Sequence, residues 1–167
     1  MQRSILFVLF AATVLLANWL IVTFGLVPVG MGLVAPAGVY AAGLAFVIRD
    51  GLHDTGGRRW VLGAIAVGAA LSAVVSPPAL ALASGLAFAT SETADMLVYT
   101  PLRRRSWLLA AVASNTVGLV VDSALFLWLA FGSLEFLAGQ VVGKFWVTAL
   151  AVSVWALLRR RALVTEA

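Results

Sequence analysis

The sequence has no cysteine and only one histidine, and these two absences exclude several kinds of chemistry. Without cysteine the chain has no disulfide, no thiolate metal site and no cysteine nucleophile. His53 alone supplies too few ligands for a zinc or haem site, so we expect neither a metal nor another cofactor. The apolar segments also lack a Ser–His pair and a His–Asp metal set, which argues against an intramembrane enzyme.

Charge is also scarce. Charged residues make up 11% of the chain, hydrophobic residues make up 63%, and the mean hydropathy is +1.07. A soluble domain of 167 residues does not need that much apolar surface, whereas a bundle of helices in a lipid bilayer does. The first apolar segment is too long for a typical signal-peptide core, so we expect it to be retained. The sequence therefore predicts an all-α membrane protein with one domain over 1–167 and six transmembrane helices at about 4–24, 31–48, 60–75, 79–99, 107–131 and 134–158.

The basic residues predict the orientation of this bundle. Of the eleven Lys and Arg residues, ten arginines are expected in loops or tails, and only Lys144 falls within a span. The arginines gather at the N-terminus, in the second and fourth loops and in the C-terminal tail. Under the positive-inside rule both termini and all ten arginines are cytoplasmic, as in a multi-pass protein of the bacterial inner membrane. This distribution accounts for the pI of about 10.7 without nucleic-acid binding.

Charged residues inside the later spans are the main functional signal. Charges at membrane depth are costly, and by default they mark a substrate or ion pathway. Around a turn at 132–133, Asp122 and Lys144 each lie 11 residues from position 133. In an antiparallel pair of helices they should lie at the same depth, because both helices rise equally per residue. By the same reasoning Glu92 should lie level with Thr116 and Asn115 across the preceding turn, near Arg104.

These polar residues follow helix faces and suit a particular ligand. A carboxylate accepts two parallel N–H bonds, as a guanine-like edge offers; an amide complements a carbonyl, and an aromatic ring covers the base. This combination suits a flat, polar, uncharged heterocycle, although the same groups can relay protons. The faces comprise Phe88, Glu92, Asp95 and Tyr99 at i, i+4, i+7 and i+11, then Asn115, Gly118 and Asp122, then Gln140 and Lys144, with Asn18 in the first span.

Structural roles remain open for several of these residues. Asp122 and Lys144 can form a neutralising buried pair that fixes helix register. Asn18 and Asn115 can serve as hydrogen bonds between helices. Asp95 can extend toward the arginine cluster near the end of its helix. Stacking of a ligand on one of three tryptophans placed deep in the spans also stays open; these are Trp19, Trp128 and Trp146.

Several runs of sequence resemble a known family. Residues 84–88, 92–99, 113–123, 129–132 and 139–144 are similar to the corresponding runs of the queuosine precursor transporter family. The resemblance covers about residues 84–148, and Asn18 in the first span also fits it. It implies a six-helix inner-membrane protein that imports 7-cyano- or 7-aminomethyl-7-deazaguanine. Together with Phe88 on the same helix face, the candidate substrate-binding residues are Asn18, Phe88, Glu92, Asp95, Asn115, Asp122, Gln140 and Lys144.

The sequence therefore predicts a small transporter for a deazapurine base, with a polar pocket near the bilayer midplane lined by the first, fourth, fifth and sixth spans. Proton-coupled and facilitated transport both stay open, and a homodimer is an option for a chain of this size. An alternative is a vitamin-binding subunit of an energy-coupled transporter, but the first span has no clear Ala-x-x-x-Ala docking pattern. A helical scaffold without cargo would not need the buried charges.

Overall fold

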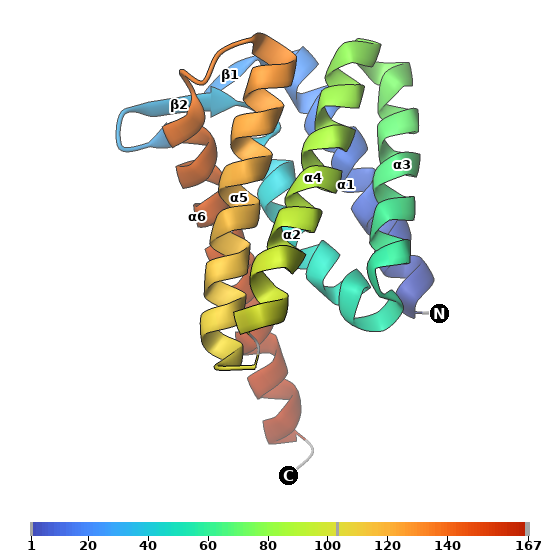
Figure 1. Cartoon of the computed structure of the whole chain (residues 1–167), viewed down its shortest axis with the longest axis vertical. Coiled ribbons are helices and arrows are strands. Elements are labelled where there is room, and N and C mark those ends of the chain that lie inside the picture. The colour runs from blue at the N-terminus through green and yellow to red at the C-terminus, as the bar shows by residue number, and fades with distance from the viewer. Residues whose placement is uncertain (1, 103, 166–167) are drawn as a thin grey trace.

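The computed structural model describes residues 2–102 and 104–165, and this part of the chain is mostly helical, as predicted (Figure 1). Six helices and one β-hairpin follow one another along it. Their order is α1 (Gln2–Phe24), β1 (Leu26–Gly30), β2 (Leu33–Pro36), α2 (Val39–Gly56), α3 (Arg58–Val75), α4 (Pro78–Leu102), α5 (Trp107–Phe131) and α6 (Leu137–Thr165).

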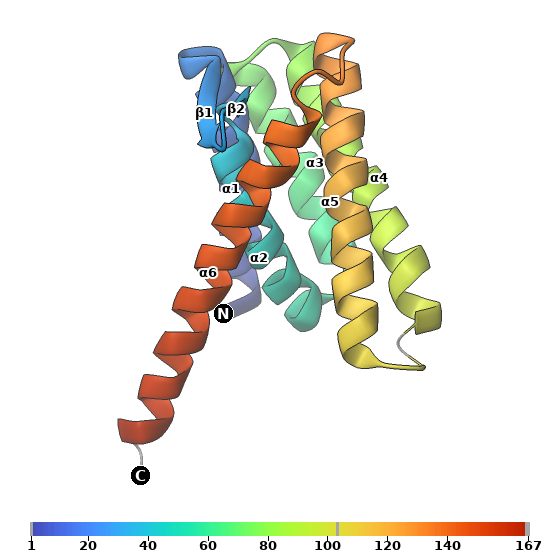
Figure 2. The same ribbon diagram turned by 90° about the vertical axis from the view of Figure 1, so that its left-hand side faces the viewer.

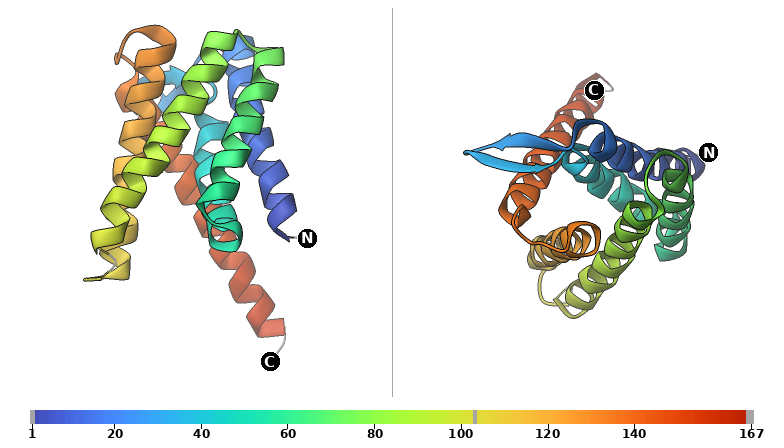
Figure 3. Two further views of the ribbon diagram at one scale, coloured as in Figure 1. Left: turned by 45° about the vertical axis from the view of Figure 1, so that its right-hand side comes forward. Right: turned by 90° about the horizontal axis from the view of Figure 1, so that it is seen from above.

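The helices form a bundle that is open at one end. Helix α1 packs on α2 and α3, α4 packs on α3 and α5, and α6 packs on α2 and α5. Both termini lie at the end of the bundle that also carries the α2–α3 and α4–α5 connections (Figures 1 and 2). At this end α4 and α5 lie apart from α2 and α3 (Figure 3, left). The β-hairpin lies at the opposite end and projects sideways from the ring of helices (Figure 3, right).

The hairpin replaces the start of the predicted second span, so the prediction of a helix from position 31 is wrong. Gly30, Met31 and Gly32 all have positive φ angles, which make a tight turn. The flanking residues pair in antiparallel register, with Leu26 opposite Pro36. An exposed sheet edge is costly in hydrocarbon. The position of the hairpin at the end of the bundle agrees with that constraint.

Helix α2 also runs further than predicted. Residues 49–56 are helical, although the sequence placed them in a polar loop. Ala42, Ala45, Arg49 and Leu52 form one buried helix face, and Arg49 is only 4% exposed. The prediction that all ten arginines lie in cytoplasmic loops or tails is therefore wrong for Arg49, and Arg3, Arg58, Arg59 and residues 159–161 are also helical, near the ends of α1, α3 and α6. Arg103 lies outside the described residues, and the orientation of the bundle stays a prediction.

Much of the outer surface is apolar. Large side chains such as Val74, Leu97 and Leu150 are more than two-thirds exposed. By length and composition, α1, α3 and residues Val112–Phe131 of α5 are apolar enough to cross a membrane. The total of six spans therefore stays a prediction, while an apolar helical surface of this kind is typical of a membrane protein.

A close approach between α1 and α3 gives a stability prediction. A Cβ at Gly68 would lie 2.8 Å from Cβ of Val14, whereas a Cβ at Gly63 would meet Phe7 at an ordinary 3.5 Å. We expect Gly68→Ala to lower the free energy of unfolding by about 1–3 kcal/mol because the helices must move apart. Gly63→Ala should leave it unchanged or raise it by a few tenths to about 1 kcal/mol. Thermal unfolding in detergent measures both, and equal midpoints would contradict this packing.

Candidate functional site

Asp122 of α5 and Lys144 of α6 form a buried ion pair. Lys144 Nζ lies 2.5 Å from Asp122 Oδ2, and each residue is 2% exposed. Lys144 also donates to the Ser123 hydroxyl at 3.0 Å. The prediction that Asp122 and Lys144 lie at the same depth is confirmed. The turn that sets this register begins where α5 ends, at Gly132, which adopts the left-handed conformation.

This ion pair lines a small cavity, which we call the inner pocket. Phe88 and Phe126 contribute aromatic walls, and Gln140 contributes a polar one. The free volume is about 20 Å³, which is room for about one water molecule. Gln140 is 2% exposed, and its Oε1 has no hydrogen-bond partner among the described residues. The pocket therefore combines a neutralised ion pair, two phenyl rings and an unsatisfied acceptor.

Asn18 reaches the edge of the inner pocket through a serine. Its Oδ1 accepts a hydrogen bond from the Ser84 hydroxyl at 2.8 Å, and its Nδ2 donates to the Val14 carbonyl at 3.2 Å. Ser84 itself lines the pocket. Asn18 thus joins α1 to α4, which is the structural role that the sequence left open for it.

Glu92, Asp95 and Asn115 line a different cavity, so the eight candidate residues do not share one pocket. This second cavity has a volume of about 470 Å³ and lies between the end of α2, the second half of α4 and the start of α5. We call it the acidic cleft. Its charged lining consists of one guanidinium and four carboxylates: Arg49, Asp50, Asp54, Glu92 and Asp95.

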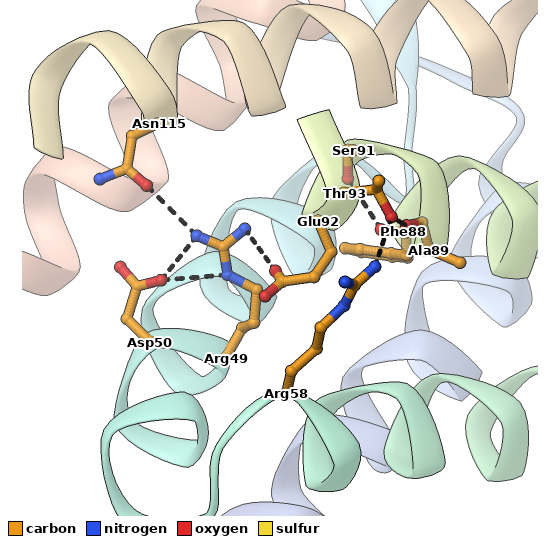
Figure 4. Close-up of polar contacts among 9 residues, drawn as sticks. All are labelled: Arg49, Asp50, Arg58, Phe88, Ala89, Ser91, Glu92, Thr93 and Asn115. Atoms are coloured by element: carbon orange, nitrogen blue, oxygen red, sulfur yellow. Dashed lines mark hydrogen bonds and ion pairs between the residues drawn. The ribbon is translucent and has the colours of Figure 1, made fainter. Parts of the chain in front are cut away.

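Arg49, which the sequence placed in a loop, is the central residue of the acidic cleft (Figure 4). Its Nη1 lies 3.1 Å from Glu92 Oε2 on α4, close enough for an ion pair but not in hydrogen-bond geometry. Its Nη2 donates to Asn115 Oδ1 on α5 at 3.2 Å, and both Nε and Nη2 donate to Asp50 Oδ1, at 3.0 and 2.6 Å. Arg49 follows the apolar residues Ala42 and Ala45 by seven and four positions. This helical spacing was the signal available in the sequence.

A thin layer of side chains separates the inner pocket from the acidic cleft. The Phe46 and Phe88 rings lie 6.0 Å apart, and the Arg49 guanidinium lies 5.2 Å from the Phe46 ring. Phe88 lines the inner pocket, whereas Glu92, one helical turn later, lines the cleft. The layer therefore comprises an aromatic pair backed by the Arg49–Glu92 ion pair.

Asp95 lies beside a glycine of α5. A Cβ at Gly118 would lie 3.5 Å from Cβ of Asp95 and 3.7 Å from its Oδ1. This Oδ1 is buried and has no hydrogen-bond partner among the described residues. The small residue at position 118 thus lets α4 and α5 pack closely where Asp95 faces α5. The Asp95 Oδ1 atom lies against α5 and does not extend toward the arginines near the end of α4.

The three deep tryptophans do not line either cavity. Trp19, Trp128 and Trp146 are 43%, 58% and 54% exposed on the outside of the bundle. The hypothesis that one of them stacks on a ligand in the pocket is not supported by this placement. Phe88 and Phe126 are the aromatic residues in position to do so.

The comparison with known families decides the class of protein. Residues 69–159, more than half of the chain, match the family described as "Putative vitamin uptake transporter". The chain belongs to this family. It is the queuosine precursor transporter family that the sequence resembled, so the protein is a membrane transporter and not an enzyme. Comparisons with curated proteins and with solved structures found no match.

The matched region includes most of the candidate site. It spans all of α4 and α5 and most of α6, and so holds every candidate residue except Asn18. Arg49 also lies outside it, on α2. The ion pair of the inner pocket and Glu92 in the cleft therefore belong to the part of the chain that carries the family relationship.

Proposed function

We propose that this transporter imports 7-cyano-7-deazaguanine or a related deazapurine base across the bacterial inner membrane. The observation that carries the proposal is the buried Gln140 Oε1, which has no hydrogen-bond partner in the described part of the chain and lines a pocket beside the Asp122–Lys144 pair. A buried acceptor without a partner costs about 1–3 kcal/mol, so a ligand that donates to it recovers that energy. The exocyclic amine and the ring N–H groups of a deazaguanine are such donors.

The rest of the inner pocket supports the same class of cargo. Asp122 can accept N–H bonds, Lys144 can donate to a carbonyl oxygen, and the rings of Phe88 and Phe126 can cover a flat heterocycle. The present volume of about 20 Å³ is far too small for a base, so cargo enters only after neighbouring helices separate. The described conformation is thus closed around the inner pocket.

Restoration of queuosine in tRNA tests this function. The host is a bacterium that neither makes nor imports the deazaguanine precursor, and it expresses this chain alone with a limiting supply of the cyano base. Queuosine in the tRNA is expected, with none in cells that carry an empty vector. No queuosine despite confirmed expression in the membrane would contradict the proposal, and it would favour another heterocycle or a vitamin-binding subunit that needs a partner ATPase.

Gln140→Leu separates a binding role from a structural role. The substitution removes the unsatisfied acceptor while keeping a side chain of similar size. We expect uptake to fall about tenfold, the effect of one lost hydrogen bond to the cargo, while stability stays equal or rises. Uptake by cells and thermal unfolding of the purified protein measure the two effects. Unchanged uptake would remove Gln140 from the binding site.

A further inference from the structure

The link between α2 and the α4–α5 pair depends on side chains. In the described part of the chain, α2 packs closely on α1, α3 and α6, but its backbone does not pack closely on α4 or α5. Arg49 reaches across this space to Glu92 on α4 and to Asn115 on α5. One buried guanidinium therefore holds three helices together where the inner pocket adjoins the acidic cleft.

We propose that Arg49 is a gate residue of the transport route. In this structure its guanidinium pairs with Glu92 Oε2 and, with Phe46 and Phe88, closes the passage between the inner pocket and the acidic cleft. The passage opens when Arg49 leaves Glu92 and the α4–α5 pair moves away from α2. The existence of this gate does not depend on the identity of the cargo.

The chemistry of Arg49 also links the gate to the cargo. Arg49 meets Glu92 through Nη1 alone, as an ion pair, whereas the ring N–H and exocyclic amine of a guanine-like base present two parallel donors to a carboxylate. Arg49 therefore occupies the group that such a cargo needs, and the cargo replaces it on Glu92. This second step rests on the proposed function.

Asp50 makes the exchange feasible, because Arg49 does not become an unpaired buried charge when it leaves Glu92. Two of its nitrogens already donate to Asp50 Oδ1, and the Asp50 side chain is 51% exposed. Asp54 and Asp95 add further negative charge to the same cleft. A guanidinium that withdraws from Glu92 thus stays paired in acidic surroundings, which avoids the penalty of an isolated buried ion.

The absence of cysteine makes the gate directly testable. Ser84→Cys places a thiol in the inner pocket, and Thr100→Cys places a control thiol in the cleft. A hydrophilic thiol reagent is applied to membrane vesicles from the side that labels Thr100→Cys. Labelling of Ser84→Cys is then compared among chains that carry Arg49, Arg49→Ala or Glu92→Gln.

We expect Ser84→Cys to react slowly with Arg49 present and about tenfold faster in both variants, the effect of losing one charge-assisted contact. Thr100→Cys should react at the same rate in all three, which shows that the cleft is intact. Glu92→Gln keeps the side-chain shape, so the labelling rate of Ser84→Cys in this variant tests the gate even if Arg49→Ala does not fold. Equal Ser84→Cys rates in the three backgrounds, or a rapid reaction with Arg49 present, would overturn the gate.

Binding of the cyano base to purified protein tests the competition. Removal of an internal competitor raises the apparent affinity, so Arg49→Ala should bind the base more tightly than the unmodified chain. Weaker binding would show that Arg49 contacts the cargo instead, and would overturn the competition. If neither protein binds the base, the cargo assignment fails, and the gate is still decided by the labelling.

Discussion

Asp122→Asn is expected to reduce uptake by roughly 100-fold or more and to destabilise the protein. The substitution leaves the Lys144 ammonium buried, with the Ser123 hydroxyl at 3.0 Å as its one remaining hydrogen-bond partner among the described residues. Breaking one side of a buried ion pair costs about 3–5 kcal/mol, which corresponds to a factor of more than 100 in an equilibrium. Insertion should persist, because the substitution removes charge from an apolar helix. Uptake of the labelled base and thermal unfolding of membrane extracts measure the two effects.

The double variant Asp122→Asn, Lys144→Gln distinguishes the two roles that the sequence left open for this pair. Replacing a buried pair by neutral groups is often close to neutral for stability. We therefore expect the thermal midpoint to return toward that of the unmodified protein while uptake stays low. Normal uptake by the double variant would show that Asp122 and Lys144 only fix helix register, and would remove them from the binding site.

The Asp122–Lys144 contact could be predicted from the sequence because it depends on local geometry alone. Two antiparallel helices rise by the same amount per residue, and a glycine fixes the point where the first one ends. Gly132 does so with a φ of 66°. Equal numbers of residues on each side of this turn then bring the two charges to one depth.

The Arg49 contacts could not be predicted in this way because they join α2 to helices far away in the sequence. An arginine in a polar stretch after an apolar segment is typical of a cytoplasmic loop, and the positive-inside rule favoured that interpretation. The buried spacing of Ala45, Arg49 and Leu52 was the competing signal, and it indicates a helix that continues. Counting residues placed Glu92 near Asn115, but it gave no indication that a cation lies between them.

The β-hairpin was missed for a related reason. Its residues are apolar, so composition merged them with the following helix into one predicted span at 31–48. The Gly30-Met31-Gly32 run between two short β-branched segments was the available signal for a hairpin. Within a chain this apolar, turn residues are better evidence for the end of a span than hydropathy is.

Glu92→Gln is expected to lower uptake by roughly 10- to 100-fold with little effect on stability. Glutamine keeps the shape of the side chain but no longer attracts the Arg49 guanidinium, which lies 3.1 Å from Glu92 Oε2. A hydrogen bond to a charged group is worth about 1.5–3 kcal/mol, and the cargo loses that contact. Arg49 keeps its two hydrogen bonds to Asp50, so no buried charge is left without a partner. Initial uptake rates at several concentrations of the base, with thermal unfolding alongside, measure these effects.

Asp54→Asn is the matched control for this prediction. It removes one negative charge from the same cleft without touching Arg49, because Asp54 lines the cleft on the exposed side of α2. A decrease in uptake much smaller than that of Glu92→Gln is expected. Equal decreases would mean that the negative potential of the cleft, which raises the local concentration of cationic ligands, controls transport. A selective effect at Glu92 would instead identify its carboxylate as a specific contact, one that Arg49 makes in this structure and that the cargo takes during transport.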